Sequence, residues 1–99
     1  MNKILFPKKD YVKELVRIFK SSKNSQKLIK ILSKYHEKDI AEAITLLTPA
    51  ERQHIYNILD EHMIAEIFSY LDDAKDYLEE LSLEKAARVV SYMDLSLIH

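Results

Sequence analysis

The chain has 99 residues, with no cysteine, no glycine and two prolines, and 47% of its residues are hydrophobic. A chain of this length forms one small domain, and the lack of cysteine excludes disulfides, thiolate metal sites and cysteine nucleophiles. The lack of glycine excludes glycine-built phosphate and dinucleotide loops, so we expect no enzymatic activity. No apolar run reaches the roughly 20 residues that span a bilayer. Because Leu, Ile, Ala, Lys and Glu are prominent, we predict an all-α fold.

Residues 1–35 are predicted to form a basic pair of helices. Pro7 fits the first turn of a helix. The spacing i, i+3, i+4, i+7 then gives this helix one apolar face, made of Val12, Leu15, Val16 and Phe19. A polar break at residues 21–25 supplies a turn and a cap. The second apolar face that follows predicts a helix ending near Tyr35.

The net charge of −1 is unevenly distributed along the chain. Residues 1–34 carry ten Lys or Arg and two acids, whereas residues 35–99 carry five Lys or Arg and fourteen acids. Such asymmetry predicts partners of opposite sign at the two ends. The basic arm fits an anionic membrane surface or a solvated face complementary to the acidic body of this or a neighbouring chain. We expect no nucleic-acid partner, because the nearby aromatic residues fall on apolar faces.

Residues 36–94 contain three copies of one segment, at residues 36–48, 60–72 and 82–94, and the copies align with one another without a gap. The copies are offset by 24 and then 22 residues, and self-similarity at such a period indicates stacked helical repeats. An alanine recurs at the same place in each copy. We therefore expect close helix contacts at Ala41, Ala65 and Ala87.

A second kind of helix alternates with the repeated segment. Thr48 and Glu51 form a capping box around a proline, which predicts a helix over residues 48–59. Its counterpart is expected over residues 72–81, two residues shorter. Residues 95–99 resemble the opening of one more, truncated helix.

Four phrases of the sequence resemble a known family. They are Leu-Ile-Lys-Ile-Leu-Ser-Lys-Tyr-His-Glu-Lys-Asp-Ile-Ala-Glu (28–42), Leu-Leu-Thr-Pro-Ala-Glu-Arg (46–52), Ile-Ala-Glu-Ile (64–67) and Leu-Ser-Leu-Glu-Lys-Ala-Ala-Arg-Val-Val (81–90). These segments are similar to the amino-terminal cytosolic domain of MgtE-type magnesium transporters. The resemblance implies a right-handed superhelix of short, HEAT-like stacked helices.

The resemblance also implies a function and partners. In that family the domain is regulatory and lies on the cytoplasmic side of the cell membrane, ahead of a pair of CBS domains and a dimeric transmembrane pore. Mg²⁺ held between acidic surfaces draws the domain onto the CBS module and closes the pore. The expected cofactor is therefore Mg²⁺, bound weakly because the partner supplies part of the site, and the expected full-length protein is a homodimer.

Four carboxylates are the candidate Mg²⁺ ligands. The acidic residue that recurs in the family's repeated segment corresponds to Glu66, within residues 64–67. A second family acid falls where this chain has Ser96, and Asp94 is the nearest carboxylate. Asp72 and Asp73 are acidic turn residues whose oxygen atoms suit Mg²⁺. All of these positions also suit helix caps and first-turn acids, which the helix dipole favours.

An alternative interpretation comes from a different class of protein. The same pattern of short helical segments also resembles the middle domain of the flagellar rotor protein FliG. That resemblance implies a helical-repeat module for protein–protein interaction. Such a module would expose apolar side chains on one face and would be indifferent to Mg²⁺.

Overall fold

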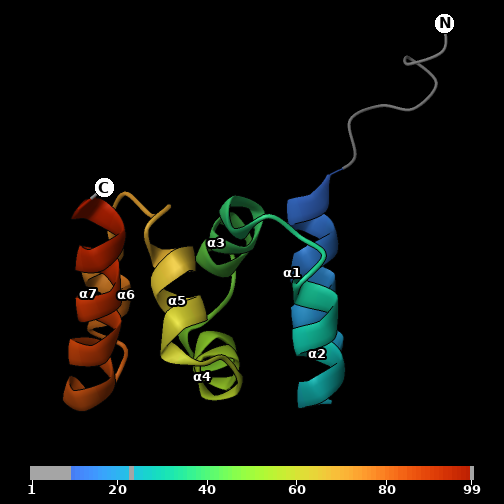
Figure 1. The fold of residues 1–99 in the computed structure, drawn as a ribbon. Helices are drawn as coiled ribbons and strands as arrows, with labels where there is room; N and C mark the ends of the chain where they lie inside the picture. The colour runs from blue at the N-terminus through green and yellow to red at the C-terminus, as the bar shows by residue number, and fades with distance from the viewer. Residues whose placement is uncertain (1–9, 23, 99) are drawn as a thin grey trace, which may run out of the picture.

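The computed structural model describes residues 10–22 and 24–98, which form seven α-helices and no strand (Figure 1). The predicted all-α fold is therefore confirmed. In chain order the helices are α1 (Tyr11–Ser21), α2 (Ser25–Leu32), α3 (Glu37–Thr45), α4 (Pro49–Ile58), α5 (Glu61–Phe68), α6 (Ala74–Leu78) and α7 (Leu83–Ile98).

Polar side chains fix where the helices begin. Asp10, Asn24 and Asp60 each accept a hydrogen bond from the backbone N–H three residues later, at 2.8 to 2.9 Å. Thr48 and Glu51 form the predicted reciprocal capping box at the start of α4. These bonds satisfy N–H groups that have no partner within the first turn.

The turns that the structure describes between the helices contain no left-handed residue. No described residue has a positive φ angle, so the left-handed residue that often ends a helix is not used. Several helices instead close with a tighter turn, in which the Leu46 N–H donates to the Ala43 carbonyl and the Tyr70 N–H donates to the Ile67 carbonyl. Such turns need no glycine.

The odd-numbered helices pack in series. Helix α1 packs on α3, α3 on α5, and α5 on α7, while α1 also contacts α4. Figure 1 shows α1 and α7 at opposite ends of this row. The buried apolar side chains form one core along the row: Leu15, Phe19, Leu28, Leu32, Ile40, Ala41, Ala43, Ile44, Leu47, Ile55, Tyr56, Leu59, Ile64, Ala65, Ile67, Phe68 and Val89. This serial packing is compatible with stacked helical repeats.

The repeated alanines do not all lie in helix contacts. Ala41 and Ala65 are buried, as predicted. Ala87 is exposed, so the prediction of a close contact there is wrong. The described residues contain no helix after α7 that would cover it.

Three predicted helix boundaries also differ from the structure. Helix α2 ends at Leu32, because Lys34 and Tyr35 make turn-type bonds to carbonyls three residues earlier. Helix α6 has only five residues. Residues 95–98 do not begin another helix but continue α7, since no proline, glycine or cap interrupts it. Pro7 lies outside the described residues.

Candidate functional site

Three of the four predicted Mg²⁺ ligands have described side chains, and all three are exposed. Glu66 lies on α5, on the opposite side from the buried residues of that helix. Asp72 and Asp73 lie in the segment that joins α5 to α6. Asp94 lies in α7, but its side chain is outside the described part.

The structure does not bring these carboxylates together into a metal centre among the described side chains. Among the described side chains, no group of three or more His, Cys, Asp or Glu is arranged to hold a metal ion. Glu66, Asp72 and Asp73 form no ion pair with a described Lys or Arg. Burial, and then the Asp73 carboxylate, raise the pKa of the Tyr77 phenol. The Asp73 carboxylate therefore lies close enough to α6 to act on its Tyr77 phenol.

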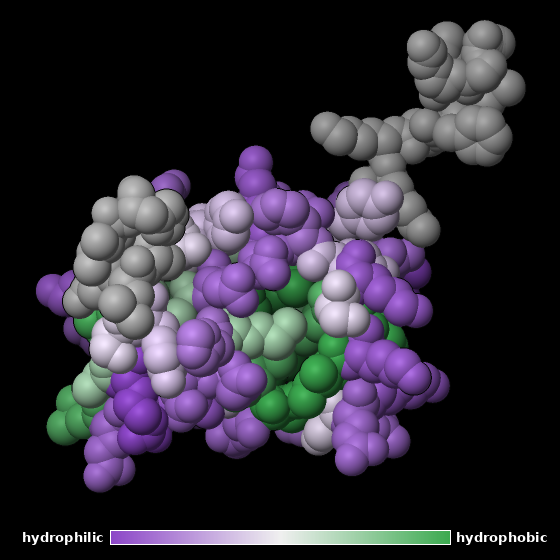
Figure 2. Space-filling view, viewed as in Figure 1, coloured by the Kyte–Doolittle hydropathy of each residue, from purple (hydrophilic) through white to green (hydrophobic). Residues whose placement is uncertain are grey.

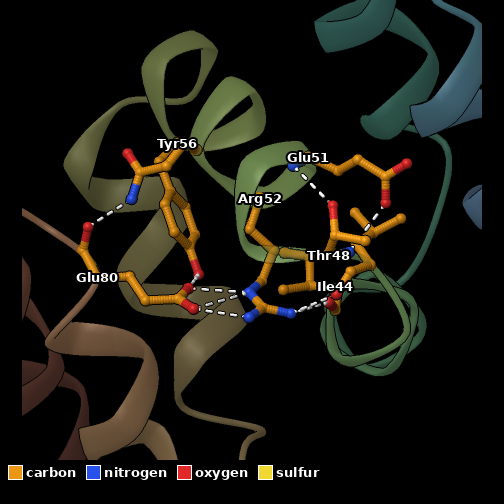
Figure 3. Close-up of polar contacts among 8 residues, drawn as sticks. Ile44, Thr48, Glu51, Arg52, Tyr56 and Glu80 are labelled. Atoms are coloured by element: carbon orange, nitrogen blue, oxygen red, sulfur yellow. Dashed lines mark hydrogen bonds and ion pairs between the residues drawn. The ribbon is translucent and has the colours of Figure 1, made fainter.

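A partly buried ion pair between Arg52 and Glu80 joins α4 to the turn after α6 (Figure 3). The Arg52 Nη2 donates to Glu80 Oε2 at 2.6 Å, and its Nε donates to Glu80 Oε1 at 2.9 Å. The remaining terminal nitrogen, Nη1, donates to the Leu47 carbonyl at 2.5 Å. The guanidinium also lies over the Tyr77 ring, 5.1 Å from its centroid. This fork geometry gives Arg52 a partner for each of its three nitrogens.

Glu80 also accepts hydrogen bonds from two further side chains. The Tyr56 hydroxyl donates to its Oε1 at 2.8 Å, and the Gln53 amide donates to its backbone carbonyl at 2.5 Å. The Arg52 hydrogen bonds hold the pKa of the Glu80 carboxyl below its ordinary value, against the effect of burial. Burial and the bond to Glu80 raise the pKa of Tyr56. The carboxylate therefore stays charged while it fixes the α6–α7 turn to α4.

The sequence analysis missed this ion pair, although a signal for it was present. Arg52 stands three, four and seven residues before Ile55, Tyr56 and Leu59, all of which are buried. That spacing places Arg52 on the apolar face of its helix. A charged residue at such a position requires a partner, but the sequence did not identify Glu80, which lies 28 residues later.

Helix α5 is also fixed to α7. The His62 and Tyr92 rings stack with their centroids 3.9 Å apart. The Arg88 Nε donates to Glu61 Oε2 at 3.2 Å. The pKa of Glu61 is lowered by a bond to its own backbone N–H and then by Arg88. Helix α5, which carries Glu66, is therefore held against α7 by a ring stack and an ion pair.

A separate cavity of about 490 Å³ lies where the end of α1 meets the start of α4. Its lining is Phe19, Lys20, Ser22, Ala50, Glu51 and His54. Lys20 and Glu51 form an ion pair at 3.8 Å on this lining. None of the predicted Mg²⁺ ligands lines the cavity, so the two features are separate candidates for function.

The comparison with protein families decides the identity of the domain. The model of the MgtE intracellular N domain matches residues 35–97. The chain belongs to this family. The match covers α3 to α7, including the Arg52–Glu80 pair and the exposed carboxylates of Glu66, Asp72 and Asp73, and the domain is accordingly the N-terminal cytosolic domain of a magnesium transporter. No curated protein and no solved structure matches the chain.

The family match also bears on the remaining expectations. In MgtE-type transporters this domain is regulatory rather than catalytic. No helix in the described ranges 10–22 and 24–98 has the length and apolar character required to cross a membrane. Helices α1 and α2 precede the matched residues.

Proposed function

We propose that this MgtE N domain senses Mg²⁺ and gates the transporter pore by docking onto the CBS module of the same protein. The observation that carries the proposal is the set of exposed carboxylates of Glu66, Asp72 and Asp73, which no described cation neutralises. We assign Asp94 to the same set from its place in the sequence.

The physical basis is charge repulsion between two acidic surfaces. Without a cation, facing carboxylates repel each other, so the domain moves away from the CBS module. A divalent ion with oxygen ligands and several retained waters lets the surfaces approach. Because ligands come from both modules, binding of Mg²⁺ and docking stabilise each other. We expect the isolated domain to bind Mg²⁺ weakly, because the partner supplies part of the site.

The test is a titration of the domain against the CBS module with Mg²⁺ and with EDTA. We expect Mg²⁺ to increase the affinity between the two modules by at least about tenfold. The Glu66→Gln variant and the Asp72→Asn, Asp73→Asn double variant should each lose most of that increase. Isothermal titration calorimetry reports both the affinity and the Mg²⁺ dependence.

Glu42 offers a matched control. It is exposed on α3 at the repeat position that Glu66 occupies on α5, but it lies in an earlier repeat. Glu42→Gln should leave Mg²⁺-dependent docking unchanged. Equal docking by all of these variants would remove the carboxylates from the mechanism.

A second candidate function, a protein-interaction module of the FliG type, is favoured by a different observation. Figure 2 shows apolar surface between the α1–α2 pair and the α3–α4 pair. Ile29 and Leu46 are large apolar side chains that remain exposed on α2 and at the end of α3. Binding of a partner protein that Leu46→Glu abolishes and EDTA does not affect would support this alternative.

The size of the native product separates the two candidates. An antibody against the domain, applied to fractionated cells, should detect a membrane-bound protein several times longer than 99 residues if the domain gates a pore in the same chain. A freely soluble product of 99 residues would contradict gating within one chain and would favour the interaction module.

A further inference from the structure

Helices α6 and α7 contribute little to the core. Helix α6 has no buried residue, and Val89 is the one buried side chain among the described residues 74–93. The other buried apolar side chains that the structure describes lie between Leu15 and Phe68, in α1 to α5 and the turns that join them. Half-buried apolar side chains of α6 and α7 complete the contact with this core. We call residues 74–98 the C-terminal unit.

Polar contacts join the C-terminal unit to α4. Glu80 lies in the turn between α6 and α7. Three side chains of α4 bind it, namely Arg52, Gln53 and Tyr56 (Figure 3). On α7, the Lys85 Nζ donates to the Tyr56 carbonyl at 2.5 Å. We call these five residues the α4 latch, and through Glu80 it holds the ends of both helices of the unit.

The described polar contacts between α5 and α7 lie near the surface. The Arg88 Nε donates to Glu61 Oε2 at 3.2 Å, and the Tyr92 ring stacks on His62. All four of these side chains are exposed or half-buried. Water replaces hydrogen bonds of this kind when they break, so each contributes little net free energy. Buried apolar contacts, which water does not replace, are concentrated in α1 to α5.

We propose that the C-terminal unit opens from α4 and α5 as one body while α1 to α5 stay folded, and that the α4 latch holds it closed. Local opening requires the least free energy where few apolar side chains are buried. Opening would uncover Tyr56 and Phe68, because the Tyr56 hydroxyl binds Glu80 and the Phe68 ring lies 6.2 Å from that of Tyr77. The motion needs no cation, so it goes beyond the proposed sensing of Mg²⁺.

Thiol reactivity tests the opening, since the chain has no cysteine of its own. Val89 and Ile40 are both fully buried, on α7 and on α3. With the thiol reagent DTNB in EDTA, Val89→Cys should react at least about tenfold faster than Ile40→Cys. Because Ile40→Cys removes the larger side chain, its own loss of stability works against this difference.

A substitution on α1 separates opening of the unit from unfolding of the whole chain. Leu15 is buried on α1, which packs on α3. Leu15→Val should raise the reactivity of Ile40→Cys roughly fivefold, because it favours unfolding of α1 to α5. It should leave the reactivity of Val89→Cys unchanged, because α1 to α5 stay folded when the unit opens.

Variants of the α4 latch test its role. Glu80→Gln should raise the reactivity of Val89→Cys roughly thirtyfold. Glu79→Gln, at the exposed neighbouring position, should change it by about twofold or less. Gln53→Leu removes one hydrogen bond to Glu80 and should raise it roughly threefold, which keeps the test valid if Glu80→Gln does not fold. Circular dichroism checks the helix content of every variant.

Three results would overturn the proposal. They are equal reactivity of Val89→Cys and Ile40→Cys, an equal increase of both on Leu15→Val, and a reactivity of Val89→Cys that neither Glu80→Gln nor Gln53→Leu changes. All of these measurements use the 99-residue chain alone in EDTA, so they do not depend on docking to the CBS module. Failure of the proposed function and failure of this opening are therefore distinguishable.

Discussion

Arg52 is the one charged side chain that is buried among the described residues, and its surroundings show how that burial is tolerated. Glu80 supplies two oxygen acceptors and Leu47 supplies a carbonyl. A buried charge without such partners would cost several kcal/mol. The ion pair therefore matters chiefly because neither partner can be removed alone.

Replacement of Glu80 tests this dependence directly. Glu80→Gln leaves the Arg52 charge buried beside a neutral amide, so the free energy of unfolding should fall by about 2 kcal/mol. Urea denaturation at pH 7 measures the change. Glu79→Gln, at the exposed neighbouring position, should change stability by less than about 0.5 kcal/mol. Equal effects of the two substitutions would show that the ion pair contributes nothing.

The pH dependence of stability provides a second test of Glu80. Its pKa is lowered in the folded state, so on acidification the unfolded chain takes up this proton first. The contribution of Glu80 is present above the ordinary carboxyl pKa of about 4.5 and is lost as the pH falls through the folded pKa. The stability difference between wild type and Glu80→Gln should hold from pH 7 to about 5 and shrink toward pH 3. A difference that stays constant to pH 3 would contradict the lowered pKa.

At the level of helices, the repeat makes equivalent positions comparable within one molecule. Ala65 on α5 is buried and Ala87 on α7 is exposed. Ala65→Leu should overpack the α5 contact and lower stability by about 1 to 3 kcal/mol, whereas Ala87→Leu should be nearly neutral. Thermal unfolding measures both changes. A large loss in Ala87→Leu would mean that α7 is covered on this side.

Helix boundaries were predictable from sequence where local chemistry sets them. The Thr48 capping box and the apolar spacing of Leu15 and Phe19 each depend on residues within one or two turns, and both predictions agree with the structure. Helix α6 was predicted too long, because its end is set by distant groups. Arg52 and Gln53 bind the Glu80 side chain and backbone carbonyl there, and no local pattern indicates such partners.

The candidate site was predictable to a different extent. The exposure of Glu66, Asp72 and Asp73 follows from their places opposite an apolar face or in a turn. Their lack of a shared metal cluster among the described residues does not follow from sequence, since it depends on how the turn after α5 is placed. The exposure of Ala87 and Val90 on α7 also required the structure, because both look like core residues in the repeat.

Across the whole molecule, the uneven distribution of charge along the sequence is also a distribution in space within the described structure. Lys13, Arg17 and Lys20 are exposed along one side of α1, at the opposite end of the row from α7 (Figure 1). Basic side chains near an anionic bilayer each contribute about 1 kcal/mol to binding. The α1 end is therefore the part of the domain that an anionic membrane would attract.

Vesicle sedimentation tests this attraction. The chain should bind vesicles containing phosphatidylserine more strongly than neutral vesicles, and added salt should weaken that binding. The double variant Lys13→Gln, Arg17→Gln should lower the affinity roughly tenfold. Lys38→Gln with Lys75→Gln removes the same charge from exposed positions of the body and should have a smaller effect. Equal losses would indicate that net charge alone is responsible.

The turns built without positive φ angles affect the denatured ensemble as well as the fold. A chain of 99 residues without glycine has fewer backbone conformations to lose on folding than one whose turns depend on glycine. The lower entropic cost partly offsets the modest burial available to a domain of this size. Side chains at the helix junctions can also be exchanged during evolution without forcing a non-glycine residue into a strained conformation.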